Sequence, residues 1–150
     1  MKIAIGCDHR GLKLKNALIP YLEKLNHKVR DYGTHSDESC DYPAYSYAVA
    51  KAVSGGGYKR GILICKTGIG SAITANKVIG IRAGVCNNVL AATLSREHND
   101  TNVLVLGSGF VGPKRAKDIV GAWLAAKFAG GRHLRRIRQI RQIEKLESGG

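Results

Sequence analysis

A cysteine that ends an apolar run, beside a glycine-rich turn, is the residue of this chain best placed for chemistry. Cys65 closes the run Gly61–Cys65, the turn Lys66–Gly70 follows, and residues 72–78 have a helical pattern. A strand, a turn and a helix in this order leave several backbone N–H groups unpaired near the positive end of the helix. Their field would bind a phosphate or an enediolate and favour a thiolate, the form that takes a proton from carbon. A cysteine that simply ends a core strand is the ordinary alternative, and the motif alone does not decide.

Further polar residues stand near the ends of other expected elements. They are Asp8 with His9, His98 with Asn99, and Arg132 with His133 and Arg136. Each has an ordinary explanation: Asp8 as a helix cap, His98 as a surface histidine, and the arginines as solvated neighbours. Two arginines one helical turn apart also form a forked donor pair suited to phosphate. Together these residues indicate an anionic substrate.

Length and composition predict one ordinary α/β domain over residues 1–150. The chain has 44% hydrophobic and 6% aromatic residues, and 24 Lys and Arg against 11 Asp and Glu give a formal charge of +13. The basic residues gather near the end of the chain, where a solvated helix face, an anionic ligand or nucleic acid would each account for them. Without interleaved aromatic residues or a zinc-finger or RNA-recognition signature, nucleic acid is not favoured.

The cysteines and the first residues bear on the cellular compartment. Cys7, Cys40, Cys65 and Cys86 are widely spaced without a C-x-x-C pair, which argues against a zinc site and against disulfides. The start of the chain has no signal-peptide pattern, and no run of apolar residues is long enough to span a membrane. We therefore expect a cytoplasmic protein with reduced thiols.

Apolar runs alternate regularly with helical patterns. Short strands are expected at residues 3–5, 29–32, 62–65, 83–86 and 103–106, with helices at 14–25, 43–53, 71–78, 89–96, from Pro113 to the double glycine at 130–131, and at 133–146. This order predicts a Rossmann-like, doubly wound, three-layer αβα sandwich with a five-stranded parallel sheet. The carboxyl ends of the strands, where such folds bind ligands, would carry Cys7–His9, Cys65–Thr67 and Gly107–Gly109.

The final helix predicts an oligomer. Its apolar residues recur every three positions, so they form a broad band that turns around the helix axis. They are Leu134, Ile137, Ile140, Ile143 and Leu146. After a double-glycine hinge, such a helix, at about 132–146, is expected to pack on a partner subunit.

Five ordered motifs carry a resemblance over nearly the whole chain. They are Gly6–His9, Cys65-x-Thr67-Gly68-Ile69-Gly70, Ala75–Val78 with Gly80–Ala83, Arg96–Asp100, and Gly130–His133. With these motifs the chain closely resembles the type B ribose-5-phosphate isomerases, whose family also includes galactose-6-phosphate isomerase subunits. The resemblance implies a metal-free and cofactor-free isomerase of the pentose phosphate pathway, which interconverts ribose 5-phosphate and ribulose 5-phosphate through a cis-enediolate.

The resemblance also implies roles for individual residues. Cys65 would be the base that moves the proton between C1 and C2, and Thr67 and His98 would assist ring opening. Asp8 would orient sugar hydroxyls, and Tyr42 would line the pocket. The backbone of residues 66 to 70, with Lys66, Gly68, Ile69 and Gly70 among the binding residues, would form the anion hole.

The phosphate and the subunit interface complete the implied site. His9, Arg132 and Arg136 would hold the phosphate, and His133 belongs to the same binding set. His98 and Asn99 would come from the partner chain of a homodimer, or of a dimer of dimers. These roles agree with elementary chemistry, because a developing enediolate needs preorganised donors and remote phosphate binding positions the reacting carbons.

Three positions depart from patterns in the resembled family. Some relatives use a glutamate as the base where this chain has Ser71, which leaves Cys65 as the candidate. The family normally has glycine at the position of Lys66 and arginine at the position of Gly109. The lysine would strain the turn if its φ were positive. One hypothesis is that its ammonium replaces the lost charge; the alternative is that Lys66 points to solvent.

Two other functions stay open from the residues alone. In the first alternative, the chain is an isomerase of another sugar or sugar phosphate, such as allose 6-phosphate. In the second, the chain is a noncatalytic protein that binds a sugar phosphate or nucleic acid on an isomerase scaffold, since a fold does not fix a function.

Overall fold

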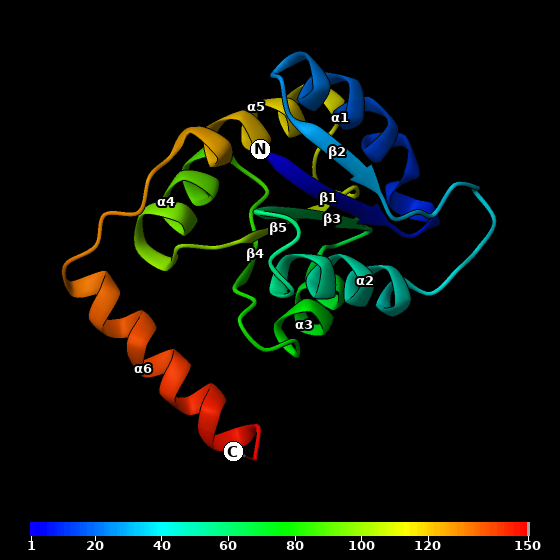
Figure 1. Cartoon of the computed structure of the whole chain (residues 1–150). Helices are drawn as coiled ribbons and strands as arrows, with labels where there is room; N and C mark the ends of the chain where they lie inside the picture. Colours follow the sequence, from blue (N-terminus) through cyan, green and yellow to red (C-terminus); the bar gives the residue numbers. More distant parts are fainter. Residues whose placement is uncertain (150) are drawn as a thin grey trace.

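Five parallel strands form one sheet in the structure, a computed structural model that describes residues 1–149 (Figure 1). The strands are β1 (Lys2–Cys7), β2 (Lys28–Asp31), β3 (Arg60–Cys65), β4 (Ala83–Val85) and β5 (Val103–Gly107). Their order across the sheet is β2-β1-β3-β5-β4, and each neighbouring pair is parallel. The predicted parallel sheet of five strands is confirmed.

Helices cover both faces of this sheet. They are a short 3-10 turn, η1 (His9–Gly11), and α1 (Leu12–Lys24), α2 (Tyr42–Ser54), α3 (Ile69–Asn76), α4 (Val89–Asn99), α5 (Pro113–Ala125) and α6 (Arg132–Glu147). Helices α1, α4 and α5 pack on one face, and α2 and α3 pack on the other. The three-layer sandwich is therefore also confirmed.

Burial explains why the inner strands contain so many apolar residues. Strands β1, β3 and β5 lie between two helical layers, and after their first residues nearly every side chain is buried. Such strands need apolar residues on both faces. The outer strands β2 and β4 are short and only half-buried, as is usual for exposed sheet edges.

The sheet places the ends of β1 and β3 side by side. Cys7 pairs with Ile64, and Cys65 pairs with Gly107 of β5. The connection after β1 runs through α1 on one face, whereas the connection before β3 runs through α2 on the other. This reversal marks the switch point at which doubly wound sheets bind ligands, and Asp8 and Cys65 border it.

The end of one helix was predicted several residues too late. Helix α5 ends at Ala125, not at the double glycine, and residues 126–131 form an irregular connection. Ala126 is extended, and the Ala129 N–H donates to the Glu97 carbonyl at 3.0 Å, so a contact with α4 draws the chain away from the helix axis. Gly130 and Gly131, with φ of 68° and 56°, then turn the chain into α6.

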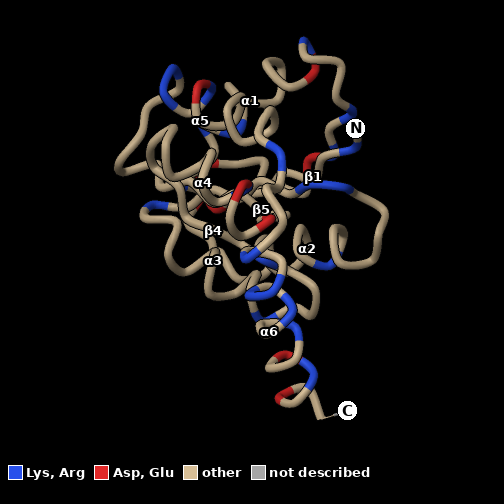
Figure 2. The backbone as a smooth tube through the Cα atoms, turned by 90° about the vertical axis from the view of Figure 1, so that its left-hand side faces the viewer, with Lys and Arg blue, Asp and Glu red and all other residues tan. Residues whose placement is uncertain are grey.

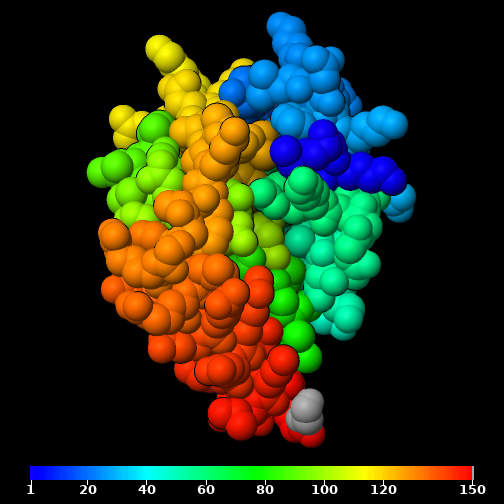
Figure 3. All heavy atoms as spheres, turned by 60° about the vertical axis from the view of Figure 1, so that its left-hand side comes forward, coloured from blue at the N-terminus to red at the C-terminus, as the bar shows by residue number. Residues whose placement is uncertain are grey.

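Helix α6 stands apart from the layers (Figure 1). The connection and α6 run down one side of the molecule as a band from orange to red (Figure 3). Only His133 and Ile137 of this helix are buried, whereas Ile140, Ile143 and Leu146 are exposed. Within residues 1–149, no helix has both the length and the apolar character that crossing a membrane requires.

Candidate functional site

Asp8 is a buried carboxylate fixed at the carboxyl edge of the sheet. Its Oδ1 accepts hydrogen bonds from the N–H groups of Arg10 and Gly11 at 3.0 and 3.3 Å, so it caps the turn η1. Its own N–H donates to the carbonyl of Ile64, the residue before Cys65. These bonds hold the carboxylate next to the end of β3.

Cys65 faces the glycine turn. Its Sγ accepts the N–H of Gly68 at 3.2 Å, and the Thr67 hydroxyl oxygen accepts the N–H of Ile69 at the same distance. Gly68 has a φ of 81°, and a Cβ there would lie 3.1 Å from Val85 and 3.3 Å from the backbone of β5. The turn therefore requires glycine at this position, and its backbone gives the sulfur an electrostatically favourable partner.

The first turn of α3 offers further donors. Within residues 1–149, the N–H groups of Gly70 and Ser71 have no hydrogen-bond acceptor, and the helix proper begins its ladder with Ala72 bonded to the Gly68 carbonyl. Unpaired N–H groups at the positive end of a helix stabilise negative charge. An anion beside Cys65 would thus meet preorganised donors.

A cavity of about 390 Å³ opens over the turn. Its lining consists of Asp8, Tyr42, Cys65, Lys66, Thr67, Ile69, Gly70 and Ile73. The Tyr42 ring lies so close to Gly70 that a Cβ on that residue would collide with it. The carboxylate, the thiol, the hydroxyl and the glycine turn therefore share one hollow, as the sequence predicts.

His9 lies at the same edge with one ring nitrogen already engaged. Its Nδ1 accepts the N–H of Cys40 at 3.1 Å. A neutral His9 in this arrangement carries its proton on Nε2, which can donate to an anionic oxygen. The backbone at Cys40 thus fixes both the orientation and the tautomer of this ring.

The other buried thiols differ from Cys65 in their surroundings. Burial raises the pKa of the Cys7 thiol to about 11, although the nearby Lys15 ammonium opposes the shift. Burial likewise raises the pKa of Cys86. Both side chains pack in the core beneath α1, α4 and α5, so neither is suited to act as a nucleophile or base near neutral pH.

The remaining predicted residues form a second cluster. The imidazole rings of His98 and His133 are stacked, with centroids 4.2 Å apart and planes 9° from parallel. Burial lowers the pKa of His133, and the positive charges of His98, Arg132 and Arg136 lower it further. Arg132 and Arg136 are exposed in the first turns of α6, and Asn99 is exposed at the end of α4.

The two clusters lie at opposite edges of the sheet. Arg82, which precedes β4, donates from Nε to the carbonyl of Asn99 at 3.1 Å, so α4 ends at the amino ends of the strands. Cys65 stands at the carboxyl end of β3, one strand length or roughly 16 Å away. One protomer therefore does not bring Cys65 together with His98, Asn99, Arg132, His133 and Arg136.

Comparisons with known proteins agree with the fold and the motifs. A sequence profile of the family described as Ribose/Galactose Isomerase matches residues 3–140. The chain belongs to this family. The ribose-5-phosphate isomerase B of Escherichia coli (strain K12) is 54% identical over 136 residues, which cover 91% of each sequence.

Solved structures extend the similarity to three dimensions. The ribose-5-phosphate isomerase B of Clostridium thermocellum superposes with a TM-score of 0.96 at 52% identity and covers 98% of this chain and 99% of that chain. The enzyme of Mycoplasma genitalium, solved with bound ribulose-5-phosphate, superposes with a TM-score of 0.93 at 40% identity and covers 96% of each chain. This member of the ribose/galactose isomerase family is thus similar to type B enzymes over nearly its full length.

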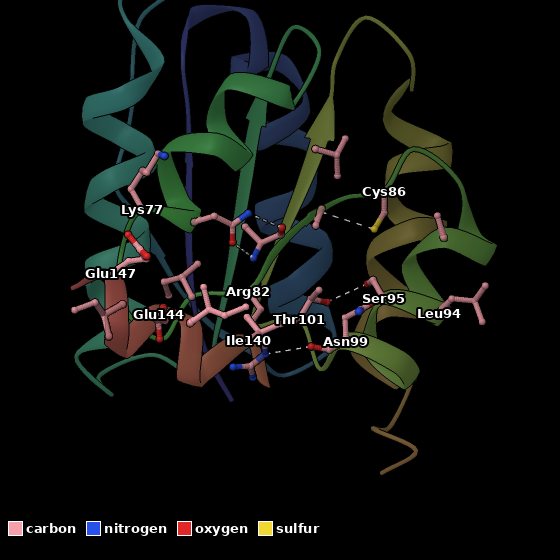
Figure 4. Close-up of a pocket in the computed structure, with 18 of the residues that line it drawn as sticks. Lys77, Arg82, Cys86, Leu94, Ser95, Asn99, Thr101, Ile140, Glu144 and Glu147 are labelled. Atoms are coloured by element: carbon pink, nitrogen blue, oxygen red, sulfur yellow. Dashed lines mark hydrogen bonds between the residues drawn. The ribbon is translucent and has the colours of Figure 1, made fainter. Parts of the chain in front are cut away.

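This ribose/galactose isomerase also has a larger hollow than the one beside Cys65. A groove of about 860 Å³ lies between α6, the edge strand β4 and α4 (Figure 4). Asn99 and Ile140 line it, and Glu144 accepts the Gly80 N–H at 2.9 Å across it. Its lining is largely apolar, and burial raises the pKa of the Cys86 thiol that borders it.

Sequence reasoning missed one ion pair that shapes the site. Lys15 is fully buried, and its Nζ lies 2.7 Å from the Asp31 carboxylate and also bonds to the Thr34 carbonyl. Asp31 in turn accepts the Gly33 N–H at 2.8 Å, which fixes the loop that leads to Cys40 and Tyr42. The available signal was a lysine within the apolar stripe of α1, three positions before Leu18.

Proposed function

We propose that this chain is an aldose–ketose isomerase that interconverts ribose 5-phosphate and ribulose 5-phosphate. The arrangement of Cys65 carries the proposal: a sulfur at the switch point of the sheet, bonded by the Gly68 N–H and open to a cavity. Membership of the family and the similarity to type B enzymes support the substrate.

The isomerisation step needs one base and one anion site. The Cys65 thiolate takes the proton from C2 of the open-chain aldose, and the electron pair moves to form the C1–C2 double bond of an enediolate. The N–H groups of Gly70 and Ser71 stabilise its oxygen, since they have no other acceptor in the described chain. Cys65 then returns the proton to C1, and the hydroxyl proton moves from O2 to O1, which gives the ketose.

Ring opening precedes this step. The C1 hydroxyl loses its proton, the bond between C1 and the ring oxygen breaks, and the ring oxygen takes up a proton. We assign these two proton transfers to Thr67, which lines the cavity, and to His98 of another copy of the chain. Asp8, fixed by two N–H bonds, orients the sugar hydroxyls, and Tyr42 closes the side of the pocket.

Phosphate binding also requires two copies. His9 supplies a donor beside Cys65, whereas Arg132 and Arg136 lie at the opposite edge of the same protomer. A two-fold dimer brings the amino-edge cluster of one copy to the carboxyl edge of the other. Bidentate arginine contacts would then hold the phosphate and position the reacting carbons.

The exposed apolar surface supports a dimer. Ile140 and Ile143 of α6 are 49% and 60% exposed, and Ile79 across the groove is 60% exposed. These side chains face or border the 860 Å³ groove, which the second copy would cover. In this arrangement α6 is the oligomerisation helix of a domain that spans the chain.

The proposed thiol base also favours a cytoplasmic location for the enzyme. A thiol that acts as a base must stay reduced, so the cytoplasm suits this enzyme better than an oxidising compartment.

A substrate panel tests the proposal. Purified protein is assayed for ketose formation from ribose 5-phosphate, allose 6-phosphate, galactose 6-phosphate and unphosphorylated ribose. The fastest turnover is expected with ribose 5-phosphate, and Cys65→Ala should abolish it while phosphate binding persists. Cys40→Ser is the matched control, because the backbone N–H that His9 uses remains. Equal turnover of ribose would contradict the roles of Arg132 and Arg136, and an inactive wild type would defeat the proposal.

A further inference from the structure

The stack of His98 and His133 is built by three separate features of the chain. The Ala129 N–H bonds to the Glu97 carbonyl next to His98, which pins the connection to α4. Two glycines with positive φ then reverse the chain, so that α6 starts against the same surface. Ile137, one turn after His133, is buried and anchors the helix. The stacking is therefore imposed by the backbone on both sides.

Burial distinguishes the two rings. His133 is only 8% exposed, whereas His98 is half-buried. One face of the His98 ring is covered by its neighbour, and the ring retains access to the surface. His133 is thus poorly placed to contact a sugar phosphate, although the family resemblance places it among the binding residues.

The charges around the pair restrict its protonation. His133 is in the first turn of α6, where the helix dipole disfavours a cation. His98 faces it from α4, and Arg132 and Arg136 flank it on its own helix. Two parallel imidazolium rings 4.2 Å apart would repel each other strongly. The geometry therefore suits a pair that carries at most one proton.

We infer that His133 is a positioning residue for His98: its buried, neutral ring stacks on His98 and holds the plane of that side chain. The inference rests on the proposed function for its catalytic consequence, because His98 is the proposed proton carrier in ring opening. A neutral stacked neighbour keeps His98 in one orientation and does not oppose its uptake of a proton. The inference changes the role of His133 from a substrate ligand to a residue that supports the His98 ring.

Proton NMR titration of the imidazole Cε1–H signals in the full-length protein tests the pair without an activity assay. The pKa of His133 should lie below its ordinary value of 6.5, and it should rise in His98→Asn, which removes one positive neighbour. His27→Gln is the control, and it should leave the His133 pKa unchanged. A His133 pKa that is unshifted, or that does not respond to His98→Asn, would overturn the inference.

Kinetics with ribose 5-phosphate test the catalytic consequence. His133→Phe keeps a flat ring and should retain kcat within about two-fold, whereas His133→Ala should lower kcat by about ten-fold or more with KM changed little. If His133→Phe is as impaired as His133→Ala, the ring nitrogens act directly and the inference is wrong. Full activity of His133→Ala would also contradict it. An inactive wild type would instead count against the proposed function, and the NMR result would still decide the state of the pair.

Discussion

The side chain of Lys66 lies over Gly109. A Cβ at position 109 would stand 3.1 Å from Lys66 Cε and 3.0 Å from the Lys66 carbonyl oxygen, which already accepts the Gly109 N–H at 2.8 Å. Lys66 is not among the residues with positive φ, so it does not strain the turn. Two of the three departures from the resembled family are therefore in contact, and the bare glycine makes room for the lysine stem.

This contact supports the hypothesis that the Lys66 ammonium supplies a charge at the edge of the site. Lys66→Met, which keeps the stem, should raise KM for ribose 5-phosphate by about ten-fold and change kcat little, because a lost phosphate contact weakens binding in both ground and transition states. Steady-state kinetics with Lys59→Met as the control would measure this. Unchanged kcat and KM would remove the hypothesis.

The same contact predicts coupling between the two positions. Gly109→Arg alone should impair binding, because its side chain meets the Lys66 backbone and stem. The double variant Lys66→Gly with Gly109→Arg should recover KM toward the wild-type value. A double-mutant cycle measures this coupling. Strictly additive effects would show that the two residues act independently.

Thiol alkylation should distinguish the cysteines. At pH 7.5, Cys7 with its pKa of about 11 and Cys86 with its raised pKa should resist iodoacetamide, because only a thiolate reacts quickly. In a Cys40→Ser background, Cys65 should be labelled first, and activity should be lost at the same rate. Inorganic phosphate should slow both the labelling and the inactivation. Mass spectrometry of the peptides gives the order, and faster labelling of Cys7 would oppose the assignment.

The ion pair of Lys15 and Asp31 should matter chiefly for stability. Lys15→Met leaves the Asp31 carboxylate without its cation and the Thr34 carbonyl without its donor, so unfolding free energy should fall by about 3 kcal/mol. Adding Asp31→Asn should recover part of this loss, since the unpaired charge is then removed. Urea unfolding at fixed protein concentration measures both changes. A loss below about 1 kcal/mol would mean that the pair is not a structural clamp.

Acid should weaken the fold partly through His133. Its pKa is lowered by burial and by nearby positive charges, so between its folded pKa and 6.5 the unfolded state binds more protons. Stability is therefore lost as pH falls through this range. His133→Phe should show a smaller drop between pH 7.5 and 5.5 in urea unfolding, with His27→Gln as a comparison because the pKa of His27 is also lowered. An identical drop in His133→Phe would contradict the shift.

Hydrophobic periodicity predicted the fold because the strands and helices are separated by clear turn residues. It misplaced the end of α5, because residues 126–129 are compatible with a helix, whereas in the structure Ala126 is extended and Ala129 bonds to Glu97 of α4. Strand ends also extended beyond the apolar runs, since Lys2 and Arg60 pair in the ladder despite their charges.

The site was predictable where its residues follow strands. The carboxyl ends of β1 and β3 carry Asp8 and Cys65, so the parallel sheet brings them together. The sequence did not predict that Arg132 and Arg136 lie at the amino ends of the strands. A helix that follows an irregular connection can lie at either edge of the sheet. The stack of His98 and His133 was equally hidden, since it depends on that same connection. Lys and Arg residues recur along α6 (Figure 2). The sequence located this basic segment but did not predict which edge of the sheet it would reach.

Complementation between two inactive variants tests the composite site most directly. Cys65→Ala and His98→Asn are each expected to be inactive, because every site in either homodimer lacks one group. In a mixed dimer one site carries both changes and the other carries neither. Unfolding and refolding the two variants together in equal amounts should therefore restore about one quarter of wild-type activity. If mixed dimers form, as native mass spectrometry would show, and no activity returns, then Cys65 and His98 of different copies do not share a site.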